Sequence, residues 1–577
     1  MTDAPPPAHN APPVSAMFSK WSARHSLFSL TLATLACLLP FSNKAFHMDD
    51  PLFIWTAQHI AQHPLDPYGF RVVWYATEAP IADVTKNPPL ASYYLALFGK
   101  IFGWSERSLH LALLFPALIV ILTTYRLAGR FTRFPLLAGA ATLFTPGFLV
   151  SSTTVMCDVL MLALWVLALV FWLEGTDSGK HWQLAVAAIM IAACALTKYF
   201  GIALIPLLLA YSLCKRRRIG VAMASLAVPV LLLAVYQHWT NGLYGRGLLS
   251  DAVQYASLHN RGHELSFNAK TLVGLAFAGG CAVPALFFAP LLWKRRWIFA
   301  TLVLCIVTGL TIAGHQAWFE TPRSSAPWAA VSVQIALWIA GGISAVSVGL
   351  VVLRKMTAEA FLLSLWAGGT FLFAAYLNWT INARSVLPMI PAIAILIAYL
   401  LEAAGFFETP RSTTKIGAAL LASAVLSIWV ARADAGLANA GRRAATEIVE
   451  QVRSSQVPVY FEGHWGFQYY MQRLGARPAD VRNSSFRAGD VVIIPENTTN
   501  SFGPLPGFVL SDVKIIEWPL SGGVATMSQP LSAGLYASVW GPLPFAFGRV
   551  PPERYLVARL APVPDTNQPA PLVFKPR

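Results

Sequence analysis

The chain has 577 residues, of which 56% are hydrophobic and only 12% are charged. Soluble domains contain about 45–50% apolar and about 25% charged residues, so this composition excludes a soluble globular protein and predicts a polytopic membrane protein. The net charge is +15, but residues 433–577 are nearly balanced, with 13 basic and 11 acidic side chains. The basic excess therefore belongs to the membrane part, as the positive-inside rule expects, and no basic tract with interleaved aromatic residues suggests a nucleic-acid partner.

The chain opens with a tail rich in proline and alanine, residues 1–24, which we expect to be cytoplasmic. No cleavage site of small residues follows the first apolar run, so that run is expected to be a retained anchor. Apolar runs recur through residues 25–432 and predict a transmembrane domain of about thirteen helices. The expected spans lie near 25–42, 108–125, 134–151, 158–173, 183–197, 199–213, 219–238, 271–293, 297–314, 328–352, 358–377, 385–401 and 414–431.

Charge decides between thirteen spans and twelve, because the runs on either side of Lys198 could form one kinked helix. Thirteen spans place every basic loop cluster on the cytoplasmic face, whereas merging those two runs would split the clusters between the faces. The thirteen-span topology places a large loop, 43–107, and the C-terminal part, 433–577, outside the plasma (inner) membrane. The latter contains short strand-like runs separated by Gly, Pro and Asn, which predicts a small extracytoplasmic α/β or α+β domain.

Two adjacent carboxylates, Asp49 and Asp50, directly follow the first span. Asp50 could simply cap a helix that starts at Pro51, which is a favoured arrangement. That interpretation leaves Asp49 unexplained. A carboxylate at the membrane surface, near a phosphate, could have its pKa raised and accept a proton from a hydroxyl or an amine, which makes Asp49 a candidate general base.

The same loop continues through Lys86 and Asn87 into two prolines and an aromatic helix. Its tyrosines, Tyr93 among them, suit a membrane interface and favour an anchoring role. A lysine at this place could instead meet the phosphate of a lipid, so Lys86 and Asn87, and with them Tyr93, are candidate substrate-binding residues.

Three further charged residues lie at the expected outer ends of spans. Asp158 opens an apolar helix, where a lone carboxylate is costly and marks a functional candidate, although it could also be a helix cap. Lys198 and Arg384 stand on the outer face, against the positive-inside trend. Two such cations require an anionic partner, which could be a lipid phosphate or, alternatively, Asp158 in an intramembrane ion pair. Arg384 is the stronger phosphate candidate because a guanidinium binds in two-pronged fashion.

Metal and nucleotide sites have little support. His259 and His263 are four residues apart, as are His59 and His63, but spacing fixes no third ligand, so the default is surface histidines and a metal stays open. The chain has no Walker-type loop, no dinucleotide-binding glycine fingerprint and no GxSxG turn.

Taken together, these motifs resemble the GT-C superfamily of glycosyltransferases. The similarity covers about 43–405 and is greatest to the group of dolichyl-phosphate-mannose protein mannosyltransferases and aminoarabinose lipid A transferases. It rests on an acidic pair after the first span, a Pro-Pro-Leu-aromatic stretch, an Asp opening a middle span, the sequence LTKYFG and an Arg before LPMIPAIAIL. The resemblance implies a GT-C-like fold, and it leaves a divalent metal open because only some relatives use one.

Carried over by position, the resemblance makes Asp49 the catalytic acid of the first outer loop and puts Asp50 where many members have Glu. It makes Asp158 the second carboxylate, and Lys198 and Arg384 the lipid-phosphate cations. Relatives commonly read Lys-Pro-Pro where this chain has Asn87 before the prolines, with the lysine one place earlier.

The function implied is inverting transfer of a sugar from a polyprenyl-phosphate donor to a lipid, glycan or protein acceptor. The main alternative is a transporter or flippase of a polyprenyl-linked sugar that performs no chemistry. Transporters usually show repeated halves and charges buried in mid-span, whereas here the unusual charges gather at outer helix ends. A second alternative is a membrane scaffold that binds a partner through the aromatic segment 459–472, but it leaves the paired charges unexplained.

Overall fold

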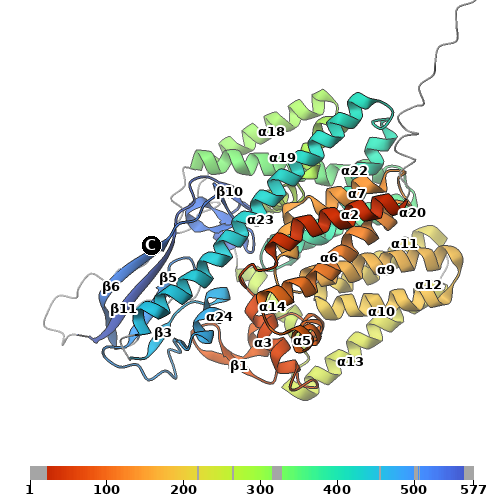
Figure 1. Ribbon diagram of the computed structural model, residues 1–577. Coiled ribbons are helices and arrows are strands. Elements are labelled where there is room, and N and C mark those ends of the chain that lie inside the picture. The colour runs from red at the N-terminus through yellow and green to blue at the C-terminus, as the bar shows by residue number, and fades with distance from the viewer. Residues whose placement is uncertain are drawn as a thin grey trace, which may run out of the picture.

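A computed structural model describes the chain over residues 23–216, 220–262, 266–314, 328–453, 457–498, 505 and 507–563. Its helices form a bundle, and a sheet domain lies beside one end of that bundle (Figure 1). One helix of 43 residues, α23 (Pro410–Val452), runs from the bundle into the sheet domain. This helix continues without a break past residue 433, where the sequence predicts the extracytoplasmic domain to begin. The predicted division into domains stays a prediction.

Eight helices of the described residues are long and apolar enough to cross a membrane, and a ninth span results if one bent pair is counted. The bent pair is α7 (Pro135–Leu143) and α8 (Pro146–Ser152), which meet at 63°. The other candidates are Ala23–Phe41 (α2 with η1), Glu106–Ala128 (α6), Asp158–Ser178 (α9), Val221–Tyr244 (α12 with α13), Trp328–Leu353 (α19), Ala358–Leu377 (α20 with η4), Ala383–Ala403 (α21, η5 and α22) and α23. The prediction of a polytopic helical membrane protein is thus confirmed.

The predicted count of thirteen spans is too high for this part of the chain. Two of the four remaining segments form helices of only 17 residues, His181–Thr197 (α10) and Tyr199–Lys215. Segment 271–293 is divided among three short helices because Pro284 and Pro290 interrupt the hydrogen-bonding pattern. The bounds of these elements are η2 (Tyr199–Ala203), α11 (Leu204–Arg216), α15 (Phe267–Cys281), α16 (Pro284–Phe287), α17 (Ala289–Leu292) and α18 (Arg295–Gly314).

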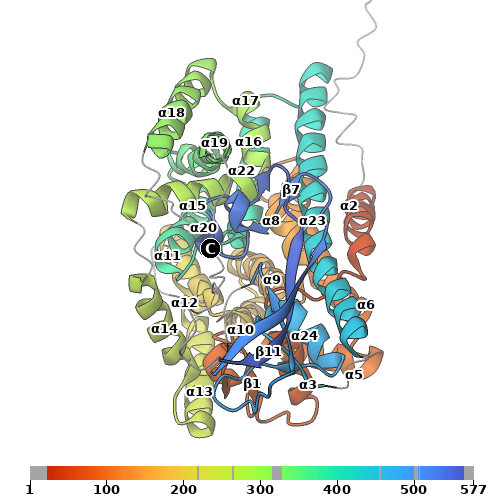
Figure 2. The same cartoon turned by 90° about the vertical axis from the view of Figure 1, so that its left-hand side faces the viewer.

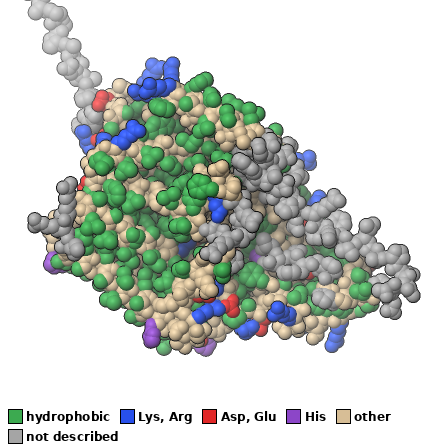
Figure 3. Space-filling view, turned by 180° about the vertical axis from the view of Figure 1, so that it is seen from behind, with side chains coloured by type: hydrophobic (Ala, Val, Ile, Leu, Met, Phe, Trp, Pro, Cys, Tyr) green, Lys and Arg blue, Asp and Glu red, His purple; other side chains and the backbone are tan. Residues whose placement is uncertain are grey.

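Small residues allow the helices of the bundle to approach closely. A Cβ atom at Gly279 of α15 would lie 1.9 Å from the Trp338 carbonyl oxygen, and one at Gly342 of α19 would lie 2.1 Å from the Leu275 carbonyl oxygen. Close backbone contact through glycine is typical of membrane helix pairs. The outer surface of the bundle is widely hydrophobic, as Figure 3 shows from behind, with Lys and Arg gathered at its upper edge.

Basic loop clusters meet at one end of the bundle. Arg126, in the last turn of α6, and Arg130 and Arg133, in the loop after it, form ion pairs with Glu174, Asp177 and Glu402, respectively. Lys215 joins them through Asp177 and also contacts Glu359. These loops are therefore together at one end of the bundle, as the positive-inside argument requires of loops that share a face.

The loop between α2 and α6 folds into small elements at the other end. Its helix α3 (Asp50–Ile60) is followed by a two-stranded ribbon, in which Arg71 pairs with Pro80. The remaining elements of this loop and of the later one are β1 (Arg71–Val73), β2 (Glu78–Pro80), α4 (Ile81–Val84), α5 (Leu90–Phe102) and α14 (Leu248–Gly262).

The C-terminal domain is a mixed five-stranded sheet in the order β4-β3-β5-β11-β6. Strand β3 lies parallel to β4 and β5, and the chain between β3 and β4 forms helix α24 (Trp465–Arg473). Strand β5, with the sequence VVIIP, is buried at every position, which suits the centre of a covered sheet. The strands are β3 (Val459–Phe461), β4 (Arg477–Pro478), β5 (Val491–Pro495), β6 (Phe508–Trp518) and β11 (Glu553–Pro562).

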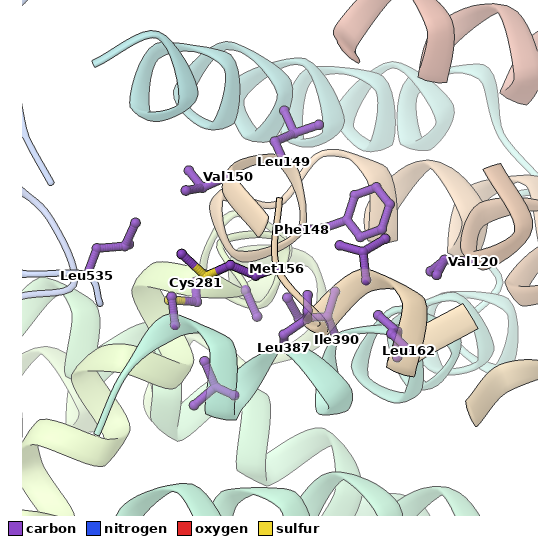
Figure 4. Packing of buried hydrophobic residues seen from close by; sticks show 14 of the residues in the cluster. Val120, Phe148, Leu149, Val150, Met156, Leu162, Cys281, Leu387, Ile390 and Leu535 are labelled. Carbon is purple, nitrogen blue, oxygen red and sulfur yellow. The ribbon is translucent and has the colours of Figure 1, made fainter. Parts of the chain in front are cut away.

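An excursion between β6 and β11 connects this domain to the bundle. It holds the short strands β7 (Val524–Ala525), β8 (Met527–Ser528), β9 (Ala533–Gly534) and β10 (Ala546–Phe547). Figure 2 shows β7 beside α23, where the Trp429 indole donates a hydrogen bond to the Gly522 carbonyl. The Leu535 carbonyl accepts from the Ala383 amide. The Leu535 side chain belongs to the same hydrophobic core as Met156 and Cys281 (Figure 4).

Candidate active site

A cavity of about 750 Å³ lies where helices of the bundle, the loop after α2 and the C-terminal domain meet. Its volume falls in the usual range for small-molecule sites, about 300–1,000 Å³. Six of the residues singled out from the sequence line it, although they come from five separate parts of the chain. They are Asp49, Lys86, Asn87, Asp158, Lys198 and Arg384.

Helix ends bring these side chains to one place. Helix α9 begins at Asp158 after a non-helical stretch, and α10 ends just before Lys198. Both charges interact favourably with the helix dipoles, because Asp158 is an acid at a helix N-terminus and Lys198 is a cation at a helix C-terminus. Arg384 is in the first turn of α21, where the dipole is unfavourable to a cation, so neighbouring acids must offset it.

Asp49 and Arg384 form the first ion pair of the cavity. The Arg384 Nη2 donates to Asp49 Oδ2 at 3.0 Å, and the Asp49 side chain keeps 33% of its surface exposed. Asp49 occupies the N-cap position of α3, yet its side chain makes no capping hydrogen bond there. The Arg384 Nε is buried and has no hydrogen-bond partner among the described residues. The Arg384 Nη1 contacts the Met156 sulfur at 2.9 Å, so Nε is the guanidinium nitrogen that remains without a partner among the described residues.

Asp158 and Lys198 form the second ion pair. The Lys198 Nζ lies 2.6 Å from Asp158 Oδ1, and the Asp158 side chain is only 1% exposed. This is the intramembrane pair that the sequence left open as the alternative to phosphate binding. Asp158 Oδ2 has no hydrogen-bond partner among the described residues, so the pair does not satisfy the whole carboxylate.

Asp50 lies behind the cavity instead of lining it. Its side chain does not act as the cap of a helix starting at Pro51, which the sequence left open as a structural role. Instead Oδ2 accepts from the His47 amide at 2.8 Å and Oδ1 accepts from the Val155 amide at 2.8 Å. Burial raises the pKa of Asp50 to about 7, although Lys44 and the two amides act in the opposite direction. Asp50 thus ties the loop after α2 to the stretch that precedes α9.

Of the three candidates in the first outer loop, Lys86 and Asn87 line the cavity and Tyr93 does not. Lys86 Nζ forms an ion pair with Asp251 Oδ2 at 2.6 Å, and the Asn87 carbonyl accepts from the Tyr68 hydroxyl. Both line the cavity. Tyr93 is not among its lining residues, and its hydroxyl donates to a backbone carbonyl of the same loop, as an anchoring residue would.

The histidine pairs do not form a metal site in the part of the chain that the structure describes. No group of three His, Cys, Asp or Glu side chains comes together there. His259 belongs to α14, and His263 lies outside the described residues. The His59 and His63 rings stand 4.8 Å apart on the side of α3.

The C-terminal domain supplies a wall of the cavity that sequence reasoning missed. Trp465 and Trp540 line it with their rings 5.4 Å apart, together with His464 and Tyr536. His464 stacks on Trp74 at 4.5 Å, and burial lowers its pKa to about 3, so the ring is neutral. The aromatic segment 459–472 contains two of these residues, but in the sequence it suggested a surface for a protein partner and not a wall of this cavity.

The fold and the cavity define a polytopic membrane protein with a polar, charged site at one end of its bundle, closed on one side by a C-terminal sheet domain. Residues 86–240 match the family described as dolichyl-phosphate-mannose-protein mannosyltransferase. This match, which covers less than half of the chain, confirms the resemblance predicted from the motifs. No curated protein sequence matches the chain significantly.

The solved structures that match this chain share little of its sequence. An oligosaccharyltransferase of Archaeoglobus fulgidus, tethered with an acceptor peptide, has a TM-score of 0.48 at 13% identity, covering 80% of this chain. This chain spans 64% of that protein's length. ArnT from Cupriavidus metallidurans, bound to undecaprenyl phosphate, has a TM-score of 0.42 at 13% identity, covering 82% of this chain and 94% of that one.

Proposed function

We propose that this protein transfers a sugar from a polyprenyl-phosphate donor to an acceptor at the outer face of the plasma (inner) membrane. The observation that carries the proposal is the single cavity in which Asp49 lies with Lys86, Lys198 and Arg384. Such a site offers a base for the acceptor and cations for the departing phosphate. The matched family supports it, since its description pairs a dolichyl-phosphate sugar with an acceptor protein.

The cations of the cavity suit a phosphate monoester or diester. Arg384 Nε has no partner among the described residues, and together with Nη2 it can donate to phosphate oxygens. Lys198 keeps 21% of its side chain exposed, so its ammonium can bind a second oxygen. Asp49 and Asp158 hold these cations in place. Pre-organised charge of this kind stabilises a transition state without later reorganisation.

Apolar side chains line the rest of the cavity and suit the lipid tail of the donor. Phe200, Ile202 and Phe373 come from the bundle, and Val253 comes from α14. A polyprenyl chain is hydrocarbon, so burial against such residues contributes free energy in proportion to the apolar area removed from water.

The reaction would be a single inverting displacement. The acceptor hydroxyl or amine gives its proton to an Asp49 carboxylate oxygen and attacks the anomeric carbon. The bond between that carbon and the phosphate oxygen breaks, and polyprenyl phosphate leaves with the electron pair. Arg384 and Lys198 hold the negative charge that develops on the phosphate, which is the largest electrostatic contribution expected. Asp158 keeps Lys198 oriented.

A transfer assay with a radiolabelled polyprenyl-phosphate sugar tests the proposal. Purified protein in liposomes should convert the donor to a labelled product, and Asp49→Asn should lower kcat by about 100-fold or more, since a positioned base contributes about 10²–10⁴-fold. Asp83→Asn is a matched control, because Asp83 lies in the same loop, is half exposed and does not line the cavity. Equal turnover by Asp49→Asn and wild type would remove Asp49 as the base. Transport of the donor without turnover would favour the flippase alternative.

A further inference from the structure

The segment that carries Asp49 is held by residues from the far end of the chain. The Ala45 amide donates to Asn439 Oδ1 at 3.0 Å, and the Phe46 amide donates to the Tyr470 hydroxyl at 2.8 Å. Asn439 belongs to α23, and Tyr470 belongs to α24 of the sheet domain. Two consecutive backbone amides of the loop after α2 are therefore fixed by side chains that lie about 400 residues further along the chain.

A buried ion pair is the centre of this attachment. Lys44 Nζ donates to Asp434 Oδ2 at 2.6 Å, and both side chains are fully buried. Asp434 Oδ1 also accepts from the Thr526 hydroxyl at 3.1 Å, and Oδ2 accepts from the Tyr536 hydroxyl at 2.9 Å. The carboxylate thus joins the loop after α2, helix α23 and the excursion of the sheet domain. Tyr536 also lines the cavity beside Asp49.

The backbone between Lys44 and Asp49 needs this support. Met48 has a φ of 45°, in the left-handed region that a side chain other than Gly rarely adopts. Such a conformation persists only where the surroundings over-determine it. Three residues before Asp49, which are Lys44, Ala45 and Phe46, are held by α23 and the sheet domain. Asp50 after it is held by the His47 and Val155 amides. Asp49 stands between these two attachments.

We propose that Asp434 is a positioning residue, which acts through Lys44 and Tyr536 to hold Asp49 at the place where it can take the acceptor proton. This inference rests on the proposed function, and it assigns the C-terminal domain a part in the active site. A buried ion pair is often replaced by apolar residues without loss of stability, so its presence here is better explained by the geometry it imposes than by stability.

The variants are chosen so that a positioning role differs from a merely structural one. Asp434→Asn leaves Lys44 as an uncompensated buried charge and could fail to fold. Lys44→Met/Asp434→Asn removes both charges and therefore avoids that cost. Tyr536→Phe removes one hydrogen bond to Asp434 and leaves the ion pair intact. Tyr460→Phe is the matched control, since Tyr460 is a buried tyrosine of the same domain that packs against Phe486, away from the cavity.

Two readouts are measured on the full-length protein in liposomes or detergent. The first is kcat and KM for the polyprenyl-phosphate sugar on which the wild type turns over. We expect Lys44→Met/Asp434→Asn to lower kcat by about 10- to 100-fold, as a displacement near 1 Å at a reacting group does. Its KM for the donor should stay within about twofold, because ground-state binding of the donor is unchanged. The second readout is hydrogen–deuterium exchange of the peptide covering residues 44–50, which should become faster.

Wild-type kcat in the double variant, a change in KM alone, or unchanged exchange at 44–50 would overturn the positioning role. Tyr536→Phe should lower kcat by less than the double variant does, and Tyr460→Phe should match wild type in both readouts. A wild-type protein that turns over no donor would refute the proposed function instead. The exchange measurement would then still decide whether Asp434 holds the segment, since it needs no activity.

Discussion

Replacing Arg384 is the sharpest perturbation of the proposed donor site. Its guanidinium contacts Asp49 through Nη2, and its Nε has no partner among the described residues, so it can donate two charge-assisted hydrogen bonds to a departing phosphate. Each such bond contributes about 1.5–3 kcal/mol. Losing two in Arg384→Gln should raise the barrier by about 3–6 kcal/mol, which corresponds to a fall in kcat of about 10²–10⁴-fold. Arg384→Lys keeps the charge but loses the planar fork, so we expect a fall of about tenfold.

The assay is the single-turnover transfer of radiolabelled sugar from polyprenyl phosphate, with thermal unfolding measured in parallel. Asp49 is 33% exposed, so solvent screens its ion pair and the loss of Arg384 should destabilise the protein by no more than about 1 kcal/mol. Wild-type kcat in Arg384→Gln would refute the reasoning. A loss of activity that follows the loss of folded protein would do so as well, because the effect would then be on stability and not on the transition state.

Three further predictions concern stability, each measured by thermal unfolding in detergent. Burial raises the pKa of Asp50 from 3.8 to about 7, so between these pH values the folded state binds a proton that the unfolded chain has released. Asp50 should therefore contribute a free energy of unfolding that falls as pH rises through this range, opposite in sign to the contribution of buried His464, whose pKa is lowered. The Asp50 contribution is measured as the difference in slope between wild type and Asp50→Asn, and equal slopes would contradict it. Lys198→Met should lower the free energy of unfolding by about 3–5 kcal/mol, because it leaves buried Asp158 unpaired. Lys198→Met/Asp158→Asn should recover most of this loss. Wild-type stability in Lys198→Met would show that the ion pair contributes nothing to stability. Gly342→Ala should cost about 1–3 kcal/mol because its Cβ would meet a carbonyl oxygen of α15, whereas Gly369→Ala, with open space around it, should stay close to wild type.

Local sequence was enough to find the charged lining of the cavity. Asp158, Lys198 and Arg384 each stand out because a charge at the end of an apolar helix needs a partner, and that requirement is visible without knowing which partner it is. The sequence offered an ion pair with Asp158 as an alternative to phosphate binding but did not decide which cation forms it, and the structure shows Lys198. The pair of Arg384 with Asp49, 335 residues away, was not predicted. Periodicity contains no information about contacts over that separation.

Hydropathy also failed to count the spans, for a physical reason. An apolar run of sufficient length predicts burial in the membrane, but it does not say whether the backbone stays helical throughout. Segment 271–293 is apolar over its whole length, yet Pro284 and Pro290 divide it into short helices. The buried pair of Lys44 and Asp434 was missed for a different reason. Each is a single charge beside an apolar stretch, and only the tertiary structure brings the two together.

The broken helices and the site have one common cause. A membrane-spanning helix satisfies its backbone internally, so irregular backbone is tolerated at that depth only where it lines a polar cavity or is buried in protein. Here α9 begins at Asp158, α10 ends before Lys198, and the chain between η4 and α21 is irregular until Ala383. All three interruptions border the same cavity. Each gives up helical hydrogen bonds and places a charged side chain at a helix end. The resulting ion pairs keep opposite charges close at the border of the cavity, and a phosphate that binds Arg384 and Lys198 would compete with Asp49 and Asp158 for these cations.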